Sequence, residues 1–146
     1  AEREKFILGV LGSPDPYGRQ LNGMGGGVSS LSKAMIVSRS AREGVDVDYL
    51  AGQVAISEPV IDYAANCGNL SSAVGVFAID QGLVEVRDGE ATVRMFNLNT
   101  QKRVDCILQV RDGRAVVDGP FKIAGVAGTG SPIRLDFLTP GGASTG

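Results

Sequence analysis

The sequence predicts an α+β domain in which a mostly antiparallel sheet wraps as a barrel around one buried central helix. Residues 69–83 are apolar on nearly every side of a helix, a pattern typical of helices that are buried all round. Segments with strand-like composition lie on both sides of this stretch in the chain. Because only an enclosing sheet hides every face of such a helix, the pattern favours a barrel-like domain.

The first predicted element is a short helix over residues 2–11. Its apolar residues recur at helical spacing, at Phe6, Ile7, Val10 and Leu11. Gly12 and Pro14 end this pattern. Residues 13–18 have the composition of a turn and lead into a glycine-rich loop over residues 23–30.

Strands are predicted over residues 33–38, 52–56, 92–97, 104–110, 115–117 and 133–138. Asp112-Gly113 is a strong hairpin signal between two of them. The central helix is expected to begin with Asn69 as its N-cap and to end near Gly82. Residues 141–146 are typical of a linker.

Composition excludes several classes of function. The chain has 146 residues, 43% of them apolar, which suits one domain with a real core. Lys and Arg number 14 against 16 Asp and Glu, with no basic block, so a nucleic-acid partner is not expected. The longest apolar stretch, near residues 74–79, is far shorter than the roughly 20 residues of a membrane span. No signal-peptide pattern opens the chain, and a cytoplasmic location without a membrane partner is expected.

The chain contains no histidine, which removes the commonest general base, the commonest zinc ligand and every Ser-His or Cys-His nucleophile pair. Acid–base chemistry therefore falls to Lys, Cys, Tyr, Asp or Glu. The two cysteines, Cys67 and Cys106, lack the spacing and the further ligands of a metal site. No metal and no cofactor is predicted, and Cys106, on a predicted strand, is expected to be structural.

Asn66, Cys67, Gly68 and Asn69 stand where the central helix is predicted to begin. Unpaired amides at a helix start attract carboxylates, and the same field favours the thiolate of a nearby cysteine. The alternative is that Cys67 is a small buried apolar residue in a turn. The four residues alone favour neither interpretation.

Three hydroxyls and one amine follow the glycine loop, at Ser29, Ser30, Ser32 and Lys33. Partial burial of a lysine favours its neutral form, which can act as a base. An ordinary surface lysine that extends into water is the more common alternative on these residues alone. The clustered glycines, among them Gly25 and Gly26, indicate a loop that approaches a ligand through its backbone.

Three familiar motifs do not fit this segment. A phosphate-binding loop is excluded because Ser32 and Ala34 flank Lys33, and Val28 stands where a dinucleotide-binding fingerprint has its third glycine. Ser30 and Lys33 satisfy the Ser-x-x-Lys spacing of serine acyl-transfer enzymes, but the companion motifs of those enzymes are missing. That chemistry stays a remote alternative.

Five motifs occur in an order that resembles the PrpF family. They are Gly12-Ser13-Pro14-Asp15-Pro16-Tyr17, Asn22-Gly23-Met24-Gly25-Gly26, Ser29-Ser30-Leu31-Ser32-Lys33, Asp48-Tyr49-Leu50-x-Gly52-Gln53-Val54 and Asn66-Cys67-Gly68-Asn69-Leu70. The resemblance covers residues 11–140, and the family includes 2-methylaconitate isomerase, methylitaconate isomerase and oxalomesaconate tautomerase. It implies a fold like that of diaminopimelate epimerase, with two related domains, each a sheet around a helix, and a site between them.

The resemblance also implies a cofactor-independent isomerase that moves a C=C bond in small di- or tricarboxylic acids of the aconitate, 2-methylaconitate, methylitaconate or oxalomesaconate type. Lys33 is then the base that removes an allylic proton, with Cys67 opposite at the reacting carbons. Donors that stabilise the developing charge and bind the substrate are expected at Gly25, Gly26, Ser29, Ser30, Ser32, Asn66, Gly68 and Asn69. Whether one base or two move the proton stays open.

The chain departs from the family pattern in three places. It lacks an N-terminal segment with an Arg-Gly-Gly-Thr-Ser-Lys-Gly-like loop, and it carries no second domain, so residues 1–140 are interpreted as most of the first domain of a longer polypeptide. Asp62-Tyr63-Ala64-Ala65 stand where relatives often have Trp and Ser-Gly. A carboxylate-binding protein without turnover and a two-base racemase or epimerase are the alternatives, and whether the protein forms a homodimer stays open.

Overall fold

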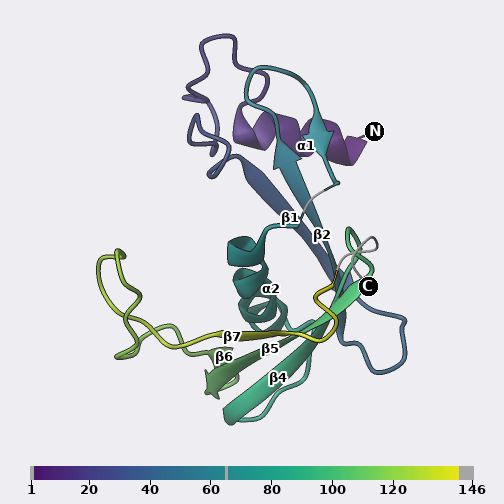
Figure 1. Cartoon of the computed structure of the whole chain (residues 1–146), viewed down its shortest axis with the longest axis vertical. Helices are drawn as coiled ribbons and strands as arrows, with labels where there is room; N and C mark the ends of the chain where they lie inside the picture. Colours follow the sequence, from purple (N-terminus) through teal and green to yellow (C-terminus); the bar gives the residue numbers. More distant parts are fainter. Residues whose placement is uncertain (1, 65, 142–146) are drawn as a thin grey trace. The chain divides into compact units, whose positions relative to one another are not determined.

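The computed structural model describes residues 2–64 and 66–141 (Figure 1). Within them lie α1 (Glu2–Leu11), β1 (Lys33–Arg39), β2 (Val47–Val54), β3 (Ile61–Asp62), α2 (Gly68–Asp80), β4 (Gly89–Asn97), β5 (Lys102–Arg111), β6 (Arg114–Ala115) and β7 (Arg134–Phe137). Neither helix of this part of the chain is long and apolar enough to cross a membrane. The predicted linker, apart from Gly141, lies outside the described residues.

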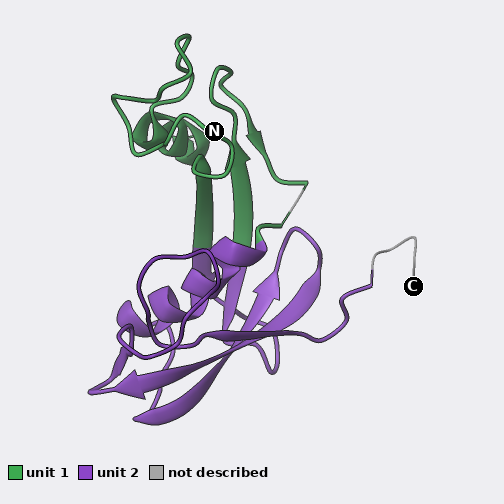
Figure 2. Cartoon of the chain, turned by 60° about the vertical axis from the view of Figure 1, so that its left-hand side comes forward, with its two compact units in different colours: residues 1–36, 50–67 green, residues 37–49, 68–146 purple. Residues whose placement is uncertain are grey.

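The chain divides into two compact units (Figure 2). The first unit contains residues 1–36 and 50–67, and the second contains residues 37–49 and 68–146. The division falls within β1 and β2, so each of these strands contributes residues to both units.

The strands form one mixed sheet in the order β1-β2-β4-β5-β6, with β3 paired to β2 and β7 paired to β5. β2 runs parallel to β4, whereas β4, β6 and β7 are antiparallel to β5. The α+β class is therefore confirmed. The order of pairing runs from β1 at one end to β6 at the other, and closure into a barrel stays a prediction.

In the first unit, α1 packs its buried residues Ile7 and Leu11 against Val54 of β2, with Ile36 and Ile61 at the edge of this core. The helix ends as predicted. Gly12 has a φ of 71°, its amide donates to Gly9, and the next amide, that of Ser13, donates to Leu8 over 2.9 Å. These two bonds make a Schellman ending, which favours glycine at the left-handed position.

In the second unit, α2 packs on β4, β5 and β6. Its buried residues are Ser71, Val74, Gly75, Ala78 and Ile79. A Cβ atom at Gly75 would lie only 2.5 Å from Cys106 Sγ, so glycine permits the helix to approach β5 closely. The buried hydroxyl of Tyr49 on β2 accepts hydrogen bonds from Asn97 over 3.0 Å and from Ser71 over 3.3 Å.

The expectation that α2 is buried on every side is wrong. Ala73 is exposed, and the Phe77 side chain one turn later is 48% exposed, because the sheet covers only one side of the helix. The helix also starts at Gly68, so Asn69 lies in its first turn and is not the N-cap. The helix ends at Asp80, close to the predicted end, and Gly82 follows it with a φ of 64°.

Two strands differ from expectation. The predicted strand over residues 52–56 begins at Val47, because residues 47–49 pair with β4. β3 was not predicted, since two residues give no periodic signal. The hairpin between β5 and β6 is confirmed, with positive φ at both Asp112 and Gly113 as a type I′ turn requires.

Gly75→Ala should destabilise α2, because the added methyl group would overlap the buried sulfur of Cys106. The expected loss is about 1–3 kcal/mol in the free energy of local opening, measured by hydrogen–deuterium exchange of peptides from α2 in the full-length protein. Gly9→Ala in α1 is the matched control. A Cβ atom there meets nothing within 4 Å, and the substitution should stabilise its helix by about 0.5–1 kcal/mol.

The double variant Gly75→Ala/Cys106→Ala tests whether overlap between the new methyl group and the Cys106 sulfur causes the destabilisation, since it removes that sulfur. Exchange of the α2 peptides should become slower than in Gly75→Ala alone. Equal exchange in the single and double variants would show that the close contact does not limit this helix.

Candidate active site

Lys33 and Cys67 lie in direct contact in the first unit. Lys33 is the first residue of β1, and Cys67 immediately precedes α2. The Lys33 amine Nζ lies 3.4 Å from Cys67 Sγ and donates a hydrogen bond to it. Both side chains are half-buried. The expected convergence of this amine and this thiol is confirmed, and their catalytic roles stay a prediction.

The pair combines the two functions that a proton shift needs. A neutral amine accepts a proton, and a thiol donates one. Because the two groups share a hydrogen bond, a proton gained by the amine has a direct path to the sulfur. The arrangement can therefore take a proton, supply a proton and return to its starting state without a third group.

Ser32, the residue before Lys33, is held in the interior of the first unit. Its side chain is fully buried, and its hydroxyl accepts a hydrogen bond from Gln20 Nε2 over 2.8 Å. Its carbonyl accepts from the Val54 amide and from Gln53 Nε2, each over 2.9 Å. The Ser32 hydroxyl is therefore used inside the unit, and its contact with substrate stays a prediction.

Ser29 and Ser30 are exposed, unlike Ser32. The Ser29 carbonyl accepts a hydrogen bond from Gln53 Nε2 over 2.9 Å, so the same glutamine holds both ends of the Ser29–Ser32 segment. The hydroxyls of Ser29 and Ser30 stay candidates for substrate contacts.

Gly25 and Gly26 are explained by packing within the loop. A Cβ atom at Gly25 would overlap the Gln20 side chain, and one at Gly26 would lie 2.5 Å from Leu31. The chain itself therefore requires glycine at these positions, and an approach to a ligand stays a prediction.

Gln20 organises this loop and was missed by the sequence analysis. Its side chain is 1% exposed and its φ is 51°. Its amide group donates to Ser32 and accepts from the Gly27 amide over 3.0 Å, while its backbone N–H donates to Asp15 over 2.6 Å. No local signal identifies it, because a glutamine between Arg19 and Leu21, in a segment that also contains glycine and asparagine, is typical of an exposed loop.

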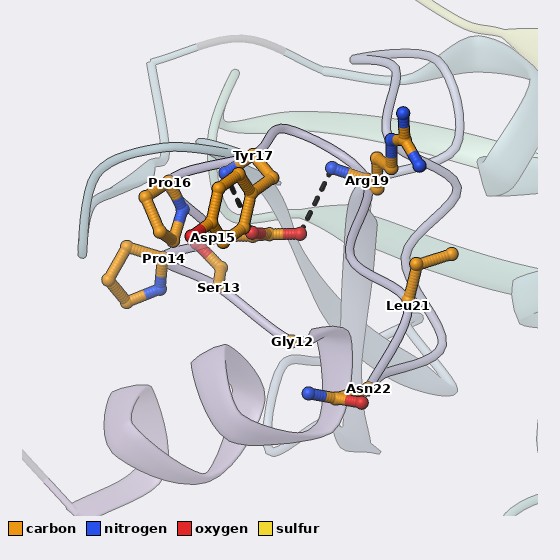
Figure 3. A pocket seen from close by; sticks show the side chains of 9 residues that line it. All are labelled: Gly12, Ser13, Pro14, Asp15, Pro16, Tyr17, Arg19, Leu21 and Asn22. Atoms are coloured by element: carbon orange, nitrogen blue, oxygen red, sulfur yellow. Dashed lines mark hydrogen bonds between the residues drawn. The ribbon is translucent and has the colours of Figure 1, made fainter.

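Asp15 holds the start of the same loop (Figure 3). Its carboxylate accepts three backbone hydrogen bonds, from Tyr17, Arg19 and Gln20. The bond from Tyr17 is the main cause that holds the pKa of the Asp15 carboxyl below its usual value; the other two amides and the Arg19 charge act in the same direction, and desolvation opposes them.

A cavity of about 780 Å³ opens beside this carboxylate, lined by Gly12, Ser13, Pro14, Asp15, Pro16, Tyr17, Arg19, Leu21 and Asn22 (Figure 3). Neither Lys33 nor Cys67 lines it. The carboxylate in this cavity is already used by backbone amides, so we place the candidate chemistry at the Lys33–Cys67 contact.

Asn66, Gly68 and Asn69 flank Cys67 along the chain. Asn66 is half-buried in the first unit, and Gly68 and Asn69 are exposed residues of the first turn of α2. Amides of a first helical turn carry partial positive charge, and their role as donors stays a prediction. Residues 62–65 are the stretch that departs from the family pattern, and the last of them, Ala65, lies outside the described residues.

The other cysteine has a different environment. Cys106 is fully buried on β5, and burial raises the pKa of its thiol to about 11, with a hydrogen bond from the Gly75 backbone acting in the opposite direction. Neither cysteine forms a disulfide. The expectation that Cys106 is structural is confirmed.

The profile of the PrpF family, described as PrpF protein, matches residues 1–146. The chain belongs to the PrpF family. The five ordered motifs therefore identified the family correctly, and its fold can be compared with a solved relative.

This PrpF chain is 46% identical over 145 residues to the putative isomerase YraM of Bacillus subtilis, covering 99% of this chain and 39% of the relative. It is 42% identical over 142 residues to 2-methyl-aconitate isomerase of Shewanella oneidensis, covering 94% and 36%. It is 43% identical over 144 residues to 3-methylitaconate isomerase of Eubacterium barkeri, covering 99% and 37%. The chain thus spans less than half the length of these relatives.

The crystal structure of a methylitaconate-delta-isomerase matches the fold with a TM-score of 0.86 and 42% identity, covering 92% of this chain and 34% of that one. An α+β fold with a mixed sheet is therefore common to this PrpF chain and the solved relative.

Gln20→Ala should loosen the loop that precedes Lys33, because it leaves the buried Ser32 hydroxyl and the Gly27 amide without this partner. The free energy of local opening of residues 20–33 should fall by about 1–3 kcal/mol, measured by hydrogen–deuterium exchange. Gln101→Ala is the matched control, since Gln101 also has a positive φ but is exposed. It should change stability by at most about 0.5 kcal/mol, and equal effects of the two variants would contradict a special role for Gln20.

Asp15→Asn should change how stability depends on pH. Because the folded-state pKa of Asp15 is lowered, its charged form adds stability that is present above the ordinary aspartate pKa of about 4 and is lost as the pH falls through the lower folded value. The difference in urea midpoint between wild type and variant should be steady near neutral pH and shrink below about pH 4. Asp118→Asn, at an exposed position, should give a difference that does not follow pH in this way.

Proposed function

We propose that the protein is a cofactor-independent isomerase that moves a C=C bond in a small di- or tricarboxylic acid by allylic proton transfer. The observation that carries the proposal is the 3.4 Å contact between Lys33 Nζ and Cys67 Sγ in a PrpF chain. Support comes from relatives named 2-methyl-aconitate isomerase, 3-methylitaconate isomerase and (4E)-oxalomesaconate Delta-isomerase, which suggest the substrate class.

In the proposed reaction, neutral Lys33 removes the allylic proton and the electron pair moves toward the neighbouring double bond and carboxylate. The Cys67 thiol then donates a proton to the far carbon of the allyl unit. Lys33 now holds one extra proton and Cys67 lacks one, and transfer across their hydrogen bond restores both. The carbons that lose and gain the proton are two bonds apart, so two groups in contact serve both from one face of the substrate.

The substrate carboxylates need donors, since negative charge develops beside them as the proton leaves. We assign this role to the exposed hydroxyls of Ser29 and Ser30 and to the side chain of Asn66. The amides of Gly68 and Asn69, which follow Cys67 directly along the chain, are further candidate donors, because a helix start favours anions. Ser32 is left out because its hydroxyl is buried against Gln20.

The alternatives predict different chemistry at the same residues. A racemase or epimerase would use two cysteines as paired bases, whereas here the partner of Cys67 is the Lys33 amine, and Cys106 is fully buried with a raised pKa. A carboxylate-binding protein without turnover has no need of a base, so it would keep its affinity when the Lys33 amine is removed.

The test is an assay of the full-length protein with 2-methylaconitate, 3-methylitaconate and 4-oxalomesaconate in deuterium oxide. We expect a change in ultraviolet absorbance and incorporation of solvent deuterium. Lys33→Ala should lower kcat by about 10²–10⁴-fold, the usual contribution of a general base. Lys122→Ala removes an exposed lysine and should leave kcat unchanged.

Two outcomes would count against the proposal. If none of the three acids is isomerised and none exchanges deuterium, the reaction class is wrong. If Lys33→Ala keeps both rate and affinity, the lysine is not the base.

A further inference from the structure

The first unit brings together two nucleophiles that the proposed reaction uses only as proton carriers. We propose that Lys33 and Cys67 also form a reversible covalent crosslink, a nitrogen–sulfur sulfenamide bond, when the protein meets hydrogen peroxide. This is a modification site made of two side chains in contact. Its formation requires no isomerase turnover.

The geometry favours a bond between these two atoms. Nζ and Sγ already lie 3.4 Å apart with the amine directed at the sulfur. A nitrogen–sulfur bond is shorter than this distance, and the flexible four-carbon stem of lysine supplies the remaining movement. Ser32, buried and hydrogen-bonded on both its hydroxyl and its carbonyl, keeps the backbone of the next residue in place during that movement.

Exposure separates the two cysteines of the chain. Cys67 is half-buried, so a molecule as small as peroxide can reach its sulfur, whereas Cys106 is fully buried. Thiolates react with peroxide and thiols do not, and Lys33 Nζ, 3.4 Å from Cys67 Sγ, is placed to exchange a proton with that sulfur. Cys106 has no such neighbour in the contacts described above, and burial raises the pKa of its thiol to about 11. Oxidation should therefore select Cys67.

The chemistry proceeds in two balanced steps. After the Cys67 proton moves to Lys33 across their hydrogen bond, the Cys67 thiolate attacks one peroxide oxygen and the O–O bond breaks. The other oxygen leaves as hydroxide and takes that proton from the Lys33 ammonium to become water, so sulfur is oxidised to sulfenic acid, peroxide is reduced and Lys33 is again neutral. The neutral Lys33 amine then attacks sulfur, the S–O bond breaks, and the departing hydroxide takes a proton from nitrogen to form a second water. A thiol such as dithiothreitol reverses the bond by restoring the amine and the thiol as it becomes a disulfide.

The crosslink would have two consequences for the molecule. It occupies both the amine and the thiol, so if the proposed function holds, the oxidised protein is inactive until it is reduced. It also removes the sulfenic acid before further peroxide converts it irreversibly to sulfinic or sulfonic acid. The lysine would then act as protection for the cysteine.

The test treats the full-length protein with hydrogen peroxide, without substrate, and follows it by mass spectrometry of the digested protein. We expect a pair of linked peptides, joined at Lys33 and Cys67 and lighter by two hydrogens than the sum of the free peptides. Dithiothreitol should separate them. Lys33→Arg keeps a cation beside Cys67 but should give no linked peptides, and Cys106 in the wild-type protein is the internal control that should stay unmodified.

The outcomes are distinct. Conversion of Cys67 to sulfinic or sulfonic acid with Lys33 unmodified would overturn the inference, as would preferential oxidation of Cys106 or a disulfide between chains. A linked pair that contains one extra oxygen would indicate a nitrogen–oxygen–sulfur bridge and would also overturn the sulfenamide. Linked peptides in a protein that isomerises none of the tested acids would keep this inference and remove the proposed function, and turnover without linkage would do the reverse.

Discussion

The first unit depends on pairing the polar groups of two glutamines in and beside its core. A buried amide or hydroxyl without a partner is costly, and Gln20 meets this constraint by bonding to Ser32 and Gly27. Gln53 adds bonds to the carbonyls of Ser29 and Ser32. These contacts bring a glycine-rich loop and a strand of distant sequence to the residue before Lys33. The position of the proposed base is therefore set by polar contacts and not by the apolar core alone.

The sequence predicted the parts of the fold that have local causes. Gly12 and Gly82 mark helix ends because a left-handed residue is needed there, and Asp112-Gly113 marks a hairpin for the same steric reason. Gln20 could not be identified, because its partners lie seven and twelve residues further along the chain. Likewise, the apolar residues around Phe77 did not reveal that the face of α2 with Phe77 is exposed. Amino-acid composition does not show which face of a helix packs against a sheet.

The candidate site was predicted in part for a related reason. Lys33 and Cys67 are of residue types that carry acid–base chemistry, and both lie in motifs of the family, so the amino-acid sequence alone is enough to name them. Ser32 shares a motif with Lys33 but points into the interior, because side chains of successive residues near a strand alternate in direction. A motif therefore identifies a segment, and the backbone conformation determines which of its side chains points toward the candidate site.

The fold places the two cysteines in contrasting environments. Gly75 lets α2 close over Cys106, and the resulting burial keeps that thiol protonated and out of reach. Cys67, one residue before the same helix, stays half-buried beside an amine. Since a thiol that exchanges protons with a neighbour must also be accessible, the environment suited to proton transfer is the one that exposes sulfur to oxidants. The contact between Lys33 and Cys67 therefore underlies both proposals. It returns the two groups to their starting protonation after the proton shift, and it places the amine next to a sulfur that peroxide can oxidise.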